Sequence, residues 1–527
     1  MTNTSTIIRA LIGVIAGFVA IYLGTAVVTA RTEAFMWVAL ASGLTLCVWL
    51  GRDIWLLIPL TMYWQLSFPW LPGGFPPSQI AVLAVLGWSF VLLAMRRLPL
   101  NFSMSGVEVA ALLLLATIFQ CYVRNPVGLL SLGGDSVGGR AYFNVAIAVL
   151  GAILLASIRI PPDRIRTAMH CMLFGSLFSW ITNTLAYFSP AVASYTGRFL
   201  GAWGRVSSAD FGSQVELNAA VDDSRATRIG PAVEGAGIMS RWISSKRNPF
   251  RSLFHPVWGT LVILTCAMAA MSGYRNILIA TGLTFAFATY YWGRMHAVIG
   301  AAILGGVVYL LLVLINPIAP LPANIQRTLT ILPGTWDQRY KDDAKESTEW
   351  RVEMWKLALF TDRYIQNKIL GDGLGLTNQE FQFIMNINTM KSISDEMTQE
   401  RAMMTQAYHS GPVQTIRVTG YLGLVVLIYA MIVVSVRAHR LICRYKGTDW
   451  FGPVLFMTLH MVWHPIFFVF VFGAFKEDVP ALLMNMGILR LLEKNLPPPK
   501  GVAVSAPAAP LASIPETRRS RTPNWST

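Results

Sequence analysis

Long apolar runs are the feature of this sequence that most restricts its fold. A helix that crosses the hydrocarbon core of a bilayer needs about 20 predominantly apolar residues, and runs near that length recur along most of the chain. The 527 residues are 54% hydrophobic and 13% charged, whereas a soluble domain carries roughly 25% charged residues. The chain has too little polar surface for a soluble fold of this size, so we expect an all-α polytopic membrane protein.

Two long polar segments, Ser189 to Phe254 and Pro317 to Gln414, interrupt the apolar runs. We expect about 12–14 transmembrane helices, with a large helical loop in the second polar segment. The run from Ile7 to Val28 leads directly into another apolar run, which favours a first span over a cleaved leader. The last two segments could instead form a re-entrant pair broken near Pro465. The apolar runs lie at 10–30, 34–50, 54–71, 79–95, 106–123, 141–158, 166–188, 255–273, 276–293, 296–316, 416–436 and 450–474, with a shorter run at 479–493.

Positive charge indicates the topology. The formal net charge is +15. In a soluble protein this charge would suit binding to nucleic acid, but in a membrane protein Lys and Arg collect in cytoplasmic loops. We therefore expect no nucleic-acid partner. If each earlier run crosses the membrane, the pair Arg96–Arg97 and the arginines within 159–166 lie on the same side as the N-terminus. That side is predicted to be cytoplasmic. The segment from Arg437 to Lys446 is predicted to be cytoplasmic too, but the runs between these anchors leave one crossing missing.

The missing span is predicted in residues 228–245, which are too polar for a hydropathy window to detect. This stretch carries Glu234 and Arg241, and a membrane helix with ionisable residues usually faces a protein interior or a watery cavity. Lys246 follows it, as expected at a cytoplasmic exit. With this span included, the turn at 272–276 and the loop 317–414 both lie on the outer face.

The chain is predicted to have five parts. The tail is rich in Pro, Ala and Ser, a composition typical of disorder. The parts are an N-terminal transmembrane bundle (1–188), central transmembrane helices with an outer loop and the hidden span 228–245 (189–316), a periplasmic loop domain (317–414), C-terminal transmembrane helices (415–495) and a disordered cytoplasmic tail (496–527).

A tight turn on the predicted outer face supplies the first candidate for binding an anion. Arg275 is the only charge in Ser272-Gly273-Tyr274-Arg275-Asn276, where two apolar runs meet. Its guanidinium offers a planar fork of donors that matches phosphate. An arginine at such a point can also simply reach the lipid headgroups.

A predicted helix in the outer loop supplies the second candidate. Residues 347–360 are expected to be helical, with Ser347 or Thr348 as N-cap. Their apolar stripe is expected to pack against another element or to lie on the membrane surface. Arg351 would lie in the first turn, where a positive charge opposes the helix dipole. We therefore expect an anionic partner for it, either Glu346 or Asp343 or a bound phosphate.

A histidine near the end of the same loop is the third candidate. His409 is the only histidine in the loop and precedes the apolar run that starts near Val418. A lone histidine is more often structural, but this side chain is the one best suited to proton transfer near neutral pH. Upstream, the segment Gly371 to Gly375 is interpreted as a tight turn built from glycines.

Taken together, these stretches resemble the superfamily of O-antigen ligases and polysaccharide polymerases. The features that carry the resemblance are Ser272-Gly273-Tyr274-Arg275, Arg351 with Trp355, Gly371 to Gly375, His409, and Gly420-Tyr421-Leu422-Gly423, and they span residues from about 228 to 436. Two positions depart from the family pattern. Ser410 stands where asparagine often follows the histidine, and the glutamate often found before the last glycine pair is absent from Val418-Thr419-Gly420.

The resemblance implies a GT-C-like membrane glycosyltransferase of the bacterial inner membrane that works at the periplasmic face without a metal. Such an enzyme takes a glycan from a polyprenyl-diphosphate carrier and passes it to a lipid or glycan acceptor, either as ligase or as polymerase. Arg275 and Arg351 would stabilise the leaving diphosphate, and His409 would accept the acceptor's proton or orient its hydroxyl. Further contacts to diphosphate or sugar are expected from Arg140, Arg327 and Arg339. No cofactor is expected, and membrane lipids surround the chain.

Two other function classes remain open. Many spans and the buried Glu234 would also suit a solute transporter, although no internal repeat is visible and the outer loop is long. A non-catalytic subunit of a polysaccharide export complex is the other alternative, and it predicts no effect of changing His409 alone.

Overall fold

The computed structural model describes residues 32–64, 75–96, 103–126, 139–189, 191–193, 228–293, 295–375, 386, 400, 402–404 and 406–498. The regular elements within these ranges are all helices, and no strand occurs among them, which confirms the all-α prediction. The expected first span at Ile7–Val28 and nearly all of the predicted tail lie outside the described residues. The elements are α2 (Thr32–Leu50), η1 (Gly51–Leu56), α3 (Leu57–Thr61), α4 (Pro77–Ala94), α5 (Gly106–Arg124), α6 (Arg140–Ser157), α7 (Asp163–Phe188), α9 (Gly230–Lys246), α10 (Pro249–Ser252), α11 (Pro256–Met271), α12 (Arg275–Trp292), α13 (Met295–Ile315), α14 (Ala323–Leu329), α15 (Gln338–Phe360), α18 (Gly411–Tyr445), α19 (Phe451–Phe470) and α20 (Phe475–Asn495).

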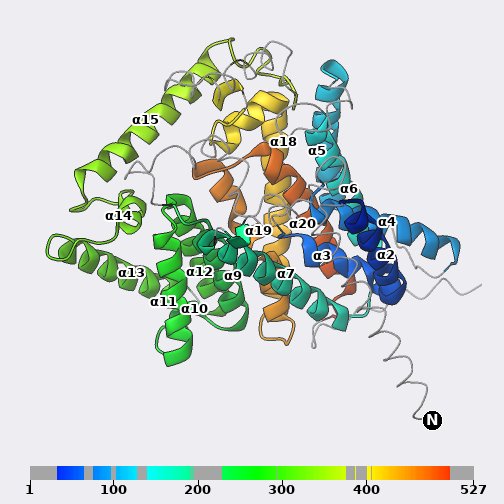
Figure 1. Ribbon diagram of the computed structural model, residues 1–527, viewed down its shortest axis with the longest axis horizontal. Helices are drawn as coiled ribbons and strands as arrows, with labels where there is room; N and C mark the ends of the chain where they lie inside the picture. Colours follow the sequence, from blue (N-terminus) through cyan, green and yellow to red (C-terminus); the bar gives the residue numbers. More distant parts are fainter. Residues whose placement is uncertain are drawn as a thin grey trace, which may run out of the picture.

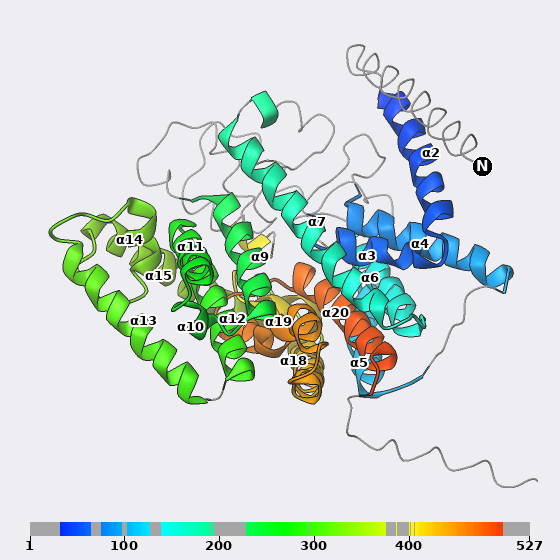
Figure 2. The same ribbon diagram turned by 90° about the horizontal axis from the view of Figure 1, so that it is seen from below.

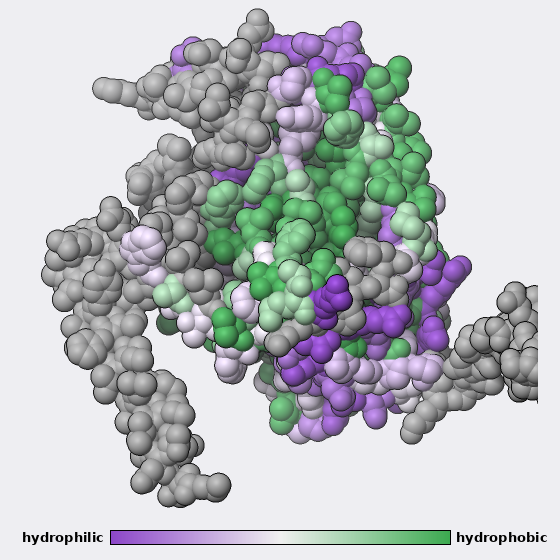
Figure 3. All heavy atoms as spheres, turned by 90° about the vertical axis from the view of Figure 1, so that its right-hand side faces the viewer, coloured by the Kyte–Doolittle hydropathy of each residue, from purple (hydrophilic) through white to green (hydrophobic). Residues whose placement is uncertain are grey.

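The described helices include seven that are long and apolar enough to cross a membrane. A multi-pass membrane protein follows from them by length and composition. Figure 3 shows hydrophobic residues in a broad band across one face, with hydrophilic residues above and below it. The candidate spans are Ala41–Thr61, Pro77–Ala94, Gly106–Arg124, Arg140–Ser157, Met295–Ile315, Gly411–Tyr445 and Phe451–Phe470.

Helices α18, α19 and α20 form the centre of the molecule (Figures 1 and 2), with α2 to α6 on one side and α13 to α15 on the other. Leu427, Ala430, Met431 and Val434 of α18 are fully buried, and their spacing of three and four residues lines one helix face. That face packs into the main apolar core. The re-entrant alternative requires a break in the helix near Pro465. Helix α19 instead continues through Pro465 to Phe470.

The polar stretch 228–245 is helical, as predicted, because α9 runs from Gly230 to Lys246. It packs against α7, α11, α12 and α19, and small buried residues such as Ala236 and Ser240 let the neighbouring helices approach. A Cβ at Gly235 would lie 2.9 Å from Nε1 of Trp180 on α7. This helix has 17 residues and is not among the seven candidate spans, so its crossing of the membrane stays a prediction.

Helix α15 differs from the predicted helix at its start. It begins at Gln338 and is capped by Asp337, whose carboxylate accepts a hydrogen bond from the amide of Arg339. The predicted N-cap at Ser347 or Thr348 is therefore wrong, because both residues lie inside the helix. Arg351 lies near the middle of α15, so an opposing dipole gives no reason for an anionic partner. Of the two expectations for the apolar stripe, packing against other parts of the protein is the one observed, since Met354 and Ala358 are fully buried.

Candidate functional site

The turn around Ser272 fixes the start of α12 at one end of the bundle. The Ser272 hydroxyl accepts a hydrogen bond from the Tyr274 amide at 3.2 Å, and Gly273 takes φ 75°, which glycine adopts without strain. Arg275 is then the first residue of α12. The Ser272 carbonyl also accepts the amide of Ile229 at 3.0 Å. This bond brings Arg228, which precedes α9, to the same turn.

A third arginine reaches this turn from the loop 317–414. Helix α14 is tied to the last residues of α11, since the Thr328 hydroxyl donates to the Ala270 carbonyl at 2.8 Å and the Asn324 amide donates to the Met271 carbonyl at 3.3 Å. Arg327 lies between these two anchors and is 8% exposed. Its guanidinium pairs with Asp343 of α15 at 3.2 Å.

Arg228, Arg275 and Arg327 form what we call the arginine cluster. Burial lowers the pKa of Arg327, and the charges of Arg228 and Arg275 lower it further, while Asp343 raises it. The guanidinium of Arg228 also lies 5.3 Å from the centre of the Tyr274 ring. Among the described residues, the cluster thus combines three guanidinium groups with the carboxylate of Asp343. This excess of positive charge is suited to a multivalent anion.

His409 is held by its neighbours in an unusual backbone conformation. Its φ is 51°, a left-handed value that few residues other than glycine adopt. The indole of Trp355 donates to the carbonyl of the preceding Tyr408 at 2.7 Å. The half-buried imidazole lies between two aromatic rings, with centroid distances of 6.1 Å to Trp350 and 6.0 Å to Phe472.

Helix α15 connects the arginine cluster to His409. Asp343, which pairs with Arg327, and Trp350, which lies against His409, are both on this helix. Their spacing of two turns puts them on nearly the same face, about 10 Å apart along the axis. One helix face therefore positions both groups at the same end of the bundle.

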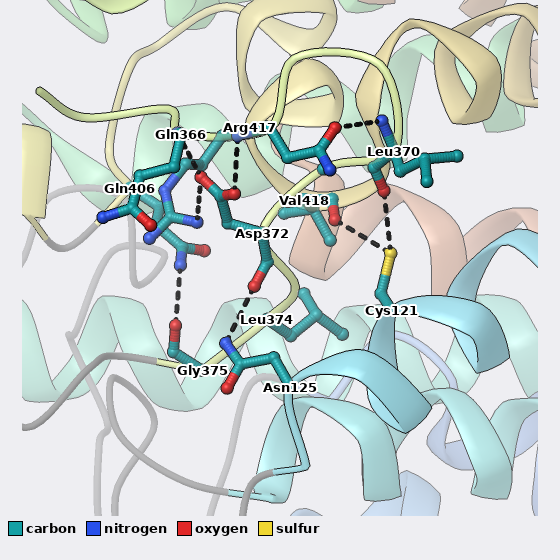
Figure 4. Close-up of polar contacts among 12 residues, drawn as sticks. Cys121, Asn125, Gln366, Leu370, Asp372, Leu374, Gly375, Gln406, Arg417 and Val418 are labelled. Carbon is teal, nitrogen blue, oxygen red and sulfur yellow. Dashed lines mark hydrogen bonds and ion pairs between the residues drawn. The ribbon is translucent and has the colours of Figure 1, made fainter. Parts of the chain in front are cut away.

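The segment Gly371 to Gly375 does more than turn the chain. It docks into a kink of α18 at Gly420, where φ is 71° and ψ is −176°. Figure 4 shows Asp372 against Arg417 of α18, and their side chains form an ion pair of 3.2 Å. Both carboxylate oxygens of Asp372 also accept backbone amides, those of Gln366 and Asn367. The turn is therefore fixed to α18 by charge as well as by its glycines.

The docked turn also contacts Cys121 and Asn125 at the end of α5, and Gln406 in the segment before His409 (Figure 4). The Cys121 thiol lies 3.3 Å from the Leu370 carbonyl, and the Asn125 amide donates to the Asp372 carbonyl at 2.9 Å. On the other side the Gln406 amide donates to the Gly375 carbonyl at 3.3 Å. Because Gln406 lies three residues before His409, this network links the histidine to the turn.

The candidates expected from sequence fall into different places. Arg275 and Arg327 lie together in the arginine cluster, and α15 connects them to His409. Arg351 is half-buried on α15, beside Trp350. Arg140 is the first residue of α6, whose Tyr142 accepts a hydrogen bond from the Leu374 amide at 3.1 Å. Arg339 is 71% exposed and pairs with Asp337 in the first turn of α15.

Sequence reasoning missed Arg228, Asp372 and Arg417. Arg228 is the first residue of the predicted span 228–245, and its place on the same predicted face as the 272–276 turn was the signal that could have found it. Asp372 was noted only as part of a turn, although an acidic residue between glycines is a frequent anchor of backbone amides. Arg417 follows the histidine by eight residues at the start of a spanning helix, where a buried charge requires a partner.

Among the described residues, no group of three or more His, Cys, Asp or Glu side chains could hold a metal ion. Comparison with known proteins adds no identification: the chain matches no family model in a scan of protein families and no protein in a search of the curated proteins.

Proposed function

We propose that this chain is a membrane glycosyltransferase that moves a glycan from a polyprenyl-diphosphate carrier to a lipid or glycan acceptor. The observation that carries the proposal is the arginine cluster, which faces Asp343 on the same helix that contacts His409. A cluster of guanidiniums and a group capable of proton transfer, both contacted by one helix, supply the two functions that this reaction needs. The resemblance to O-antigen ligases and polysaccharide polymerases supports the same class.

The proposed chemistry follows from the charge that develops in the transition state. As the bond between the sugar C1 and the diphosphate breaks, negative charge grows on the leaving diphosphate. Arg275 and Arg327 stabilise that charge through preorganised, partly desolvated donors, with Arg228 as a third contact. His409 orients the acceptor hydroxyl or takes its proton. Arg351, Arg140 and Arg339 contact the more distant parts of the diphosphate or the glycan.

The proposed setting is the bacterial inner membrane, with a cytoplasmic N-terminus and about 12–14 spans. Helix α9 is one of them in this proposal, with its exit marked by Lys246 and Arg247. The 272–275 turn, the loop 317–414 and His409 then face the periplasm, where the carrier lipid would enter from the side. This placement is supported by the position of the arginine cluster and His409 at the same end of the helix bundle.

The test compares arginine variants in a strain deleted for this chain. Arg275→Ala and Arg327→Ala are expected to lower surface polysaccharide by about 100-fold or more, the usual cost of removing a group that stabilises developing charge. Arg275→Lys keeps the charge but loses the planar fork, so partial activity is expected. The lipid-linked glycan should accumulate in each inactive variant.

Arg251→Ala is the matched control, because Arg251 is exposed on α10, at the opposite end of α11 from the cluster. Protein levels in the membrane are measured for every variant. Normal polysaccharide in Arg275→Ala, Arg351→Ala and His409→Ala at wild-type protein level would contradict the proposal.

A solute transporter is the second candidate, and ionisable groups inside the bundle favour it. The Asn183 amide of α7 donates to Glu234 of α9 at 2.5 Å, and His460 of α19 lies 3.2 Å from Asn485 of α20. Such intramembrane groups are often found along ion pathways. A proton flux in vesicles that contain the purified chain but no lipid-linked glycan would favour this function over the glycosyltransferase.

A further inference from the structure

A histidine and an aspartate that sequence reasoning did not single out form a pair where α19 and α20 meet. His464 lies near the end of α19 and Asp478 in the first turn of α20. Nε2 of His464 is 3.2 Å from Oδ1 of Asp478. The other carboxylate oxygen accepts the backbone amide of Ala474 at 2.7 Å, so the aspartate is fixed by the start of its own helix.

This contact assigns the proton on the imidazole. A carboxylate only accepts hydrogen bonds, so the nitrogen that faces it carries the hydrogen. Nε2 of His464 is therefore the donor, and in the neutral ring Nδ1 keeps a lone pair that can accept a proton. A histidine oriented through one nitrogen by a carboxylate, with the other nitrogen available, is the arrangement of a general base.

The pair is partly exposed and lies close to His409 of the proposed site. The side chain of His464 is 24% exposed and that of Asp478 is 18% exposed, so neither group is sealed inside the packed helices. The His464 ring is 6.3 Å from that of Phe468, and Phe468 lies against Gly411 of α18. Gly411 follows His409 by two residues, and Phe472 in the α19–α20 link lies against His409 itself.

The next histidine on α19 has different surroundings. His460 lies one turn deeper in the helix and faces the amide oxygen of Asn485 at 3.2 Å, and the positive charge of Arg241 on α9 acts on it. An amide holds no charge that could stabilise an imidazolium. Of these two histidines, His464 is the one with a carboxylate partner.

We infer that His464, oriented by Asp478, is the general base that takes the proton of the acceptor hydroxyl, an inference that rests on the proposed glycosyltransferase function. In this step the acceptor oxygen forms a bond to the sugar C1, and the bond from C1 to the carrier oxygen breaks. The electron pair leaves with the polyprenyl diphosphate, and the acceptor's proton moves to Nδ1 of His464, from which it returns to water. His409, held between Trp350 and Phe472, then orients the acceptor.

The experiment uses the full-length protein purified in detergent, with lipid-linked glycan extracted from cells deleted for this chain. Release of polyprenyl diphosphate gives kcat and KM, and binding of inorganic diphosphate is measured separately. His464→Ala is expected to lower kcat by about 100- to 10,000-fold, the usual contribution of general base catalysis, with diphosphate binding unchanged. Added imidazole should restore part of the turnover, and Asp478→Asn should lower kcat with the histidine still in place.

His296→Ala is the control, because His296 is an exposed histidine of α13. Turnover of His464→Ala within about threefold of wild type would overturn the inference and leave the proposed function standing. Loss of turnover that imidazole does not restore would also overturn it, since a structural role gives that result. If the wild-type protein releases no polyprenyl diphosphate, the proposed function fails and the inference with it.

Discussion

Arg417 and Asp372 form an ion pair of 3.2 Å with the arginine side chain 4% exposed and the aspartate 17% exposed. Backbone bonds run beside it, since the amide of Asp372 donates to the Arg417 carbonyl and that of Gly373 to the Val418 carbonyl, each at 2.9 Å. The pair therefore connects the 371–375 turn to the first turns of α18, which begins two residues after His409. This relationship makes the glycine-rich turn a part of the site's framework.

Removal of one partner of this pair is expected to destabilise the protein strongly. In Asp372→Ala the buried guanidinium loses its carboxylate, and two backbone amides lose their acceptor. Breaking a buried ion pair costs about 3–5 kcal/mol, so a large drop in the thermal midpoint in detergent is expected. Arg417→Ala should be comparably harmful, and the double variant should lose less than the sum of both.

The exposed pair Lys345–Glu349 of α15 is the matched control, because its side chains are 73% and 67% exposed. Lys345→Ala should change the stability by less than about 1 kcal/mol. Equal effects of Lys345→Ala and Asp372→Ala on the midpoint would show that the buried pair does not hold the turn in place.

Gly420→Ala is expected to disrupt the docking of the turn. The φ of 71° and ψ of −176° at this kink are open to glycine almost alone, and a Cβ there would collide with the carbonyl of Ile369. The variant should unfold at a lower temperature, and proteolysis of the 366–375 segment should become faster. Gly282→Ala is the control, because Gly282 is exposed within α12 and a Cβ there meets no atom within 4 Å. Similar proteolysis of both variants would contradict this role of Gly420.

Local patterns predicted the parts of the fold that depend on neighbouring residues. The helix in 228–245 followed from charge parity, and the apolar stripe of α15 appears as the burial of Met354 and Ala358. The start of α15 was missed because residues 338–346 carry no apolar stripe. This part of the helix is capped by Asp337 and contacts α14 through the Asp343–Arg327 pair.

Contacts between distant parts of the chain could not be predicted in this way. Arg417 and Asp372 are far apart in the sequence, and periodicity gives no information about which elements meet. The same holds for Arg228 beside Arg275, which depends on the bond from the Ile229 amide to the Ser272 carbonyl. The candidate residues could be selected from their chemistry, whereas their grouping required the tertiary structure.

Trp355→Phe is expected to reduce catalysis with little loss of stability. The change keeps the aromatic packing but removes the hydrogen bond of 2.7 Å to the Tyr408 carbonyl, which is worth about 1 kcal/mol. The left-handed backbone at His409 is then held less firmly, so kcat should fall by more than KM changes. Trp292→Phe is the control, because its indole makes a bond of the same length to Ser244, next to the Lys246 end of α9. An unchanged kcat in Trp355→Phe would exclude this positioning role.

Asp343→Asn is expected to strengthen the binding of anions to the arginine cluster. The carboxylate of Asp343 competes for Arg327 and repels a bound diphosphate, so its neutral amide should raise the affinity for inorganic diphosphate roughly tenfold, or about 1.4 kcal/mol. Arg327→Gln should lower that affinity, and both effects should shrink at high salt because screening weakens them. The measurement is the diphosphate-dependent rise of the thermal midpoint. If Asp343→Asn binds diphosphate more weakly than the wild type, the carboxylate serves to orient Arg327, and the cluster without it is not a competent anion site.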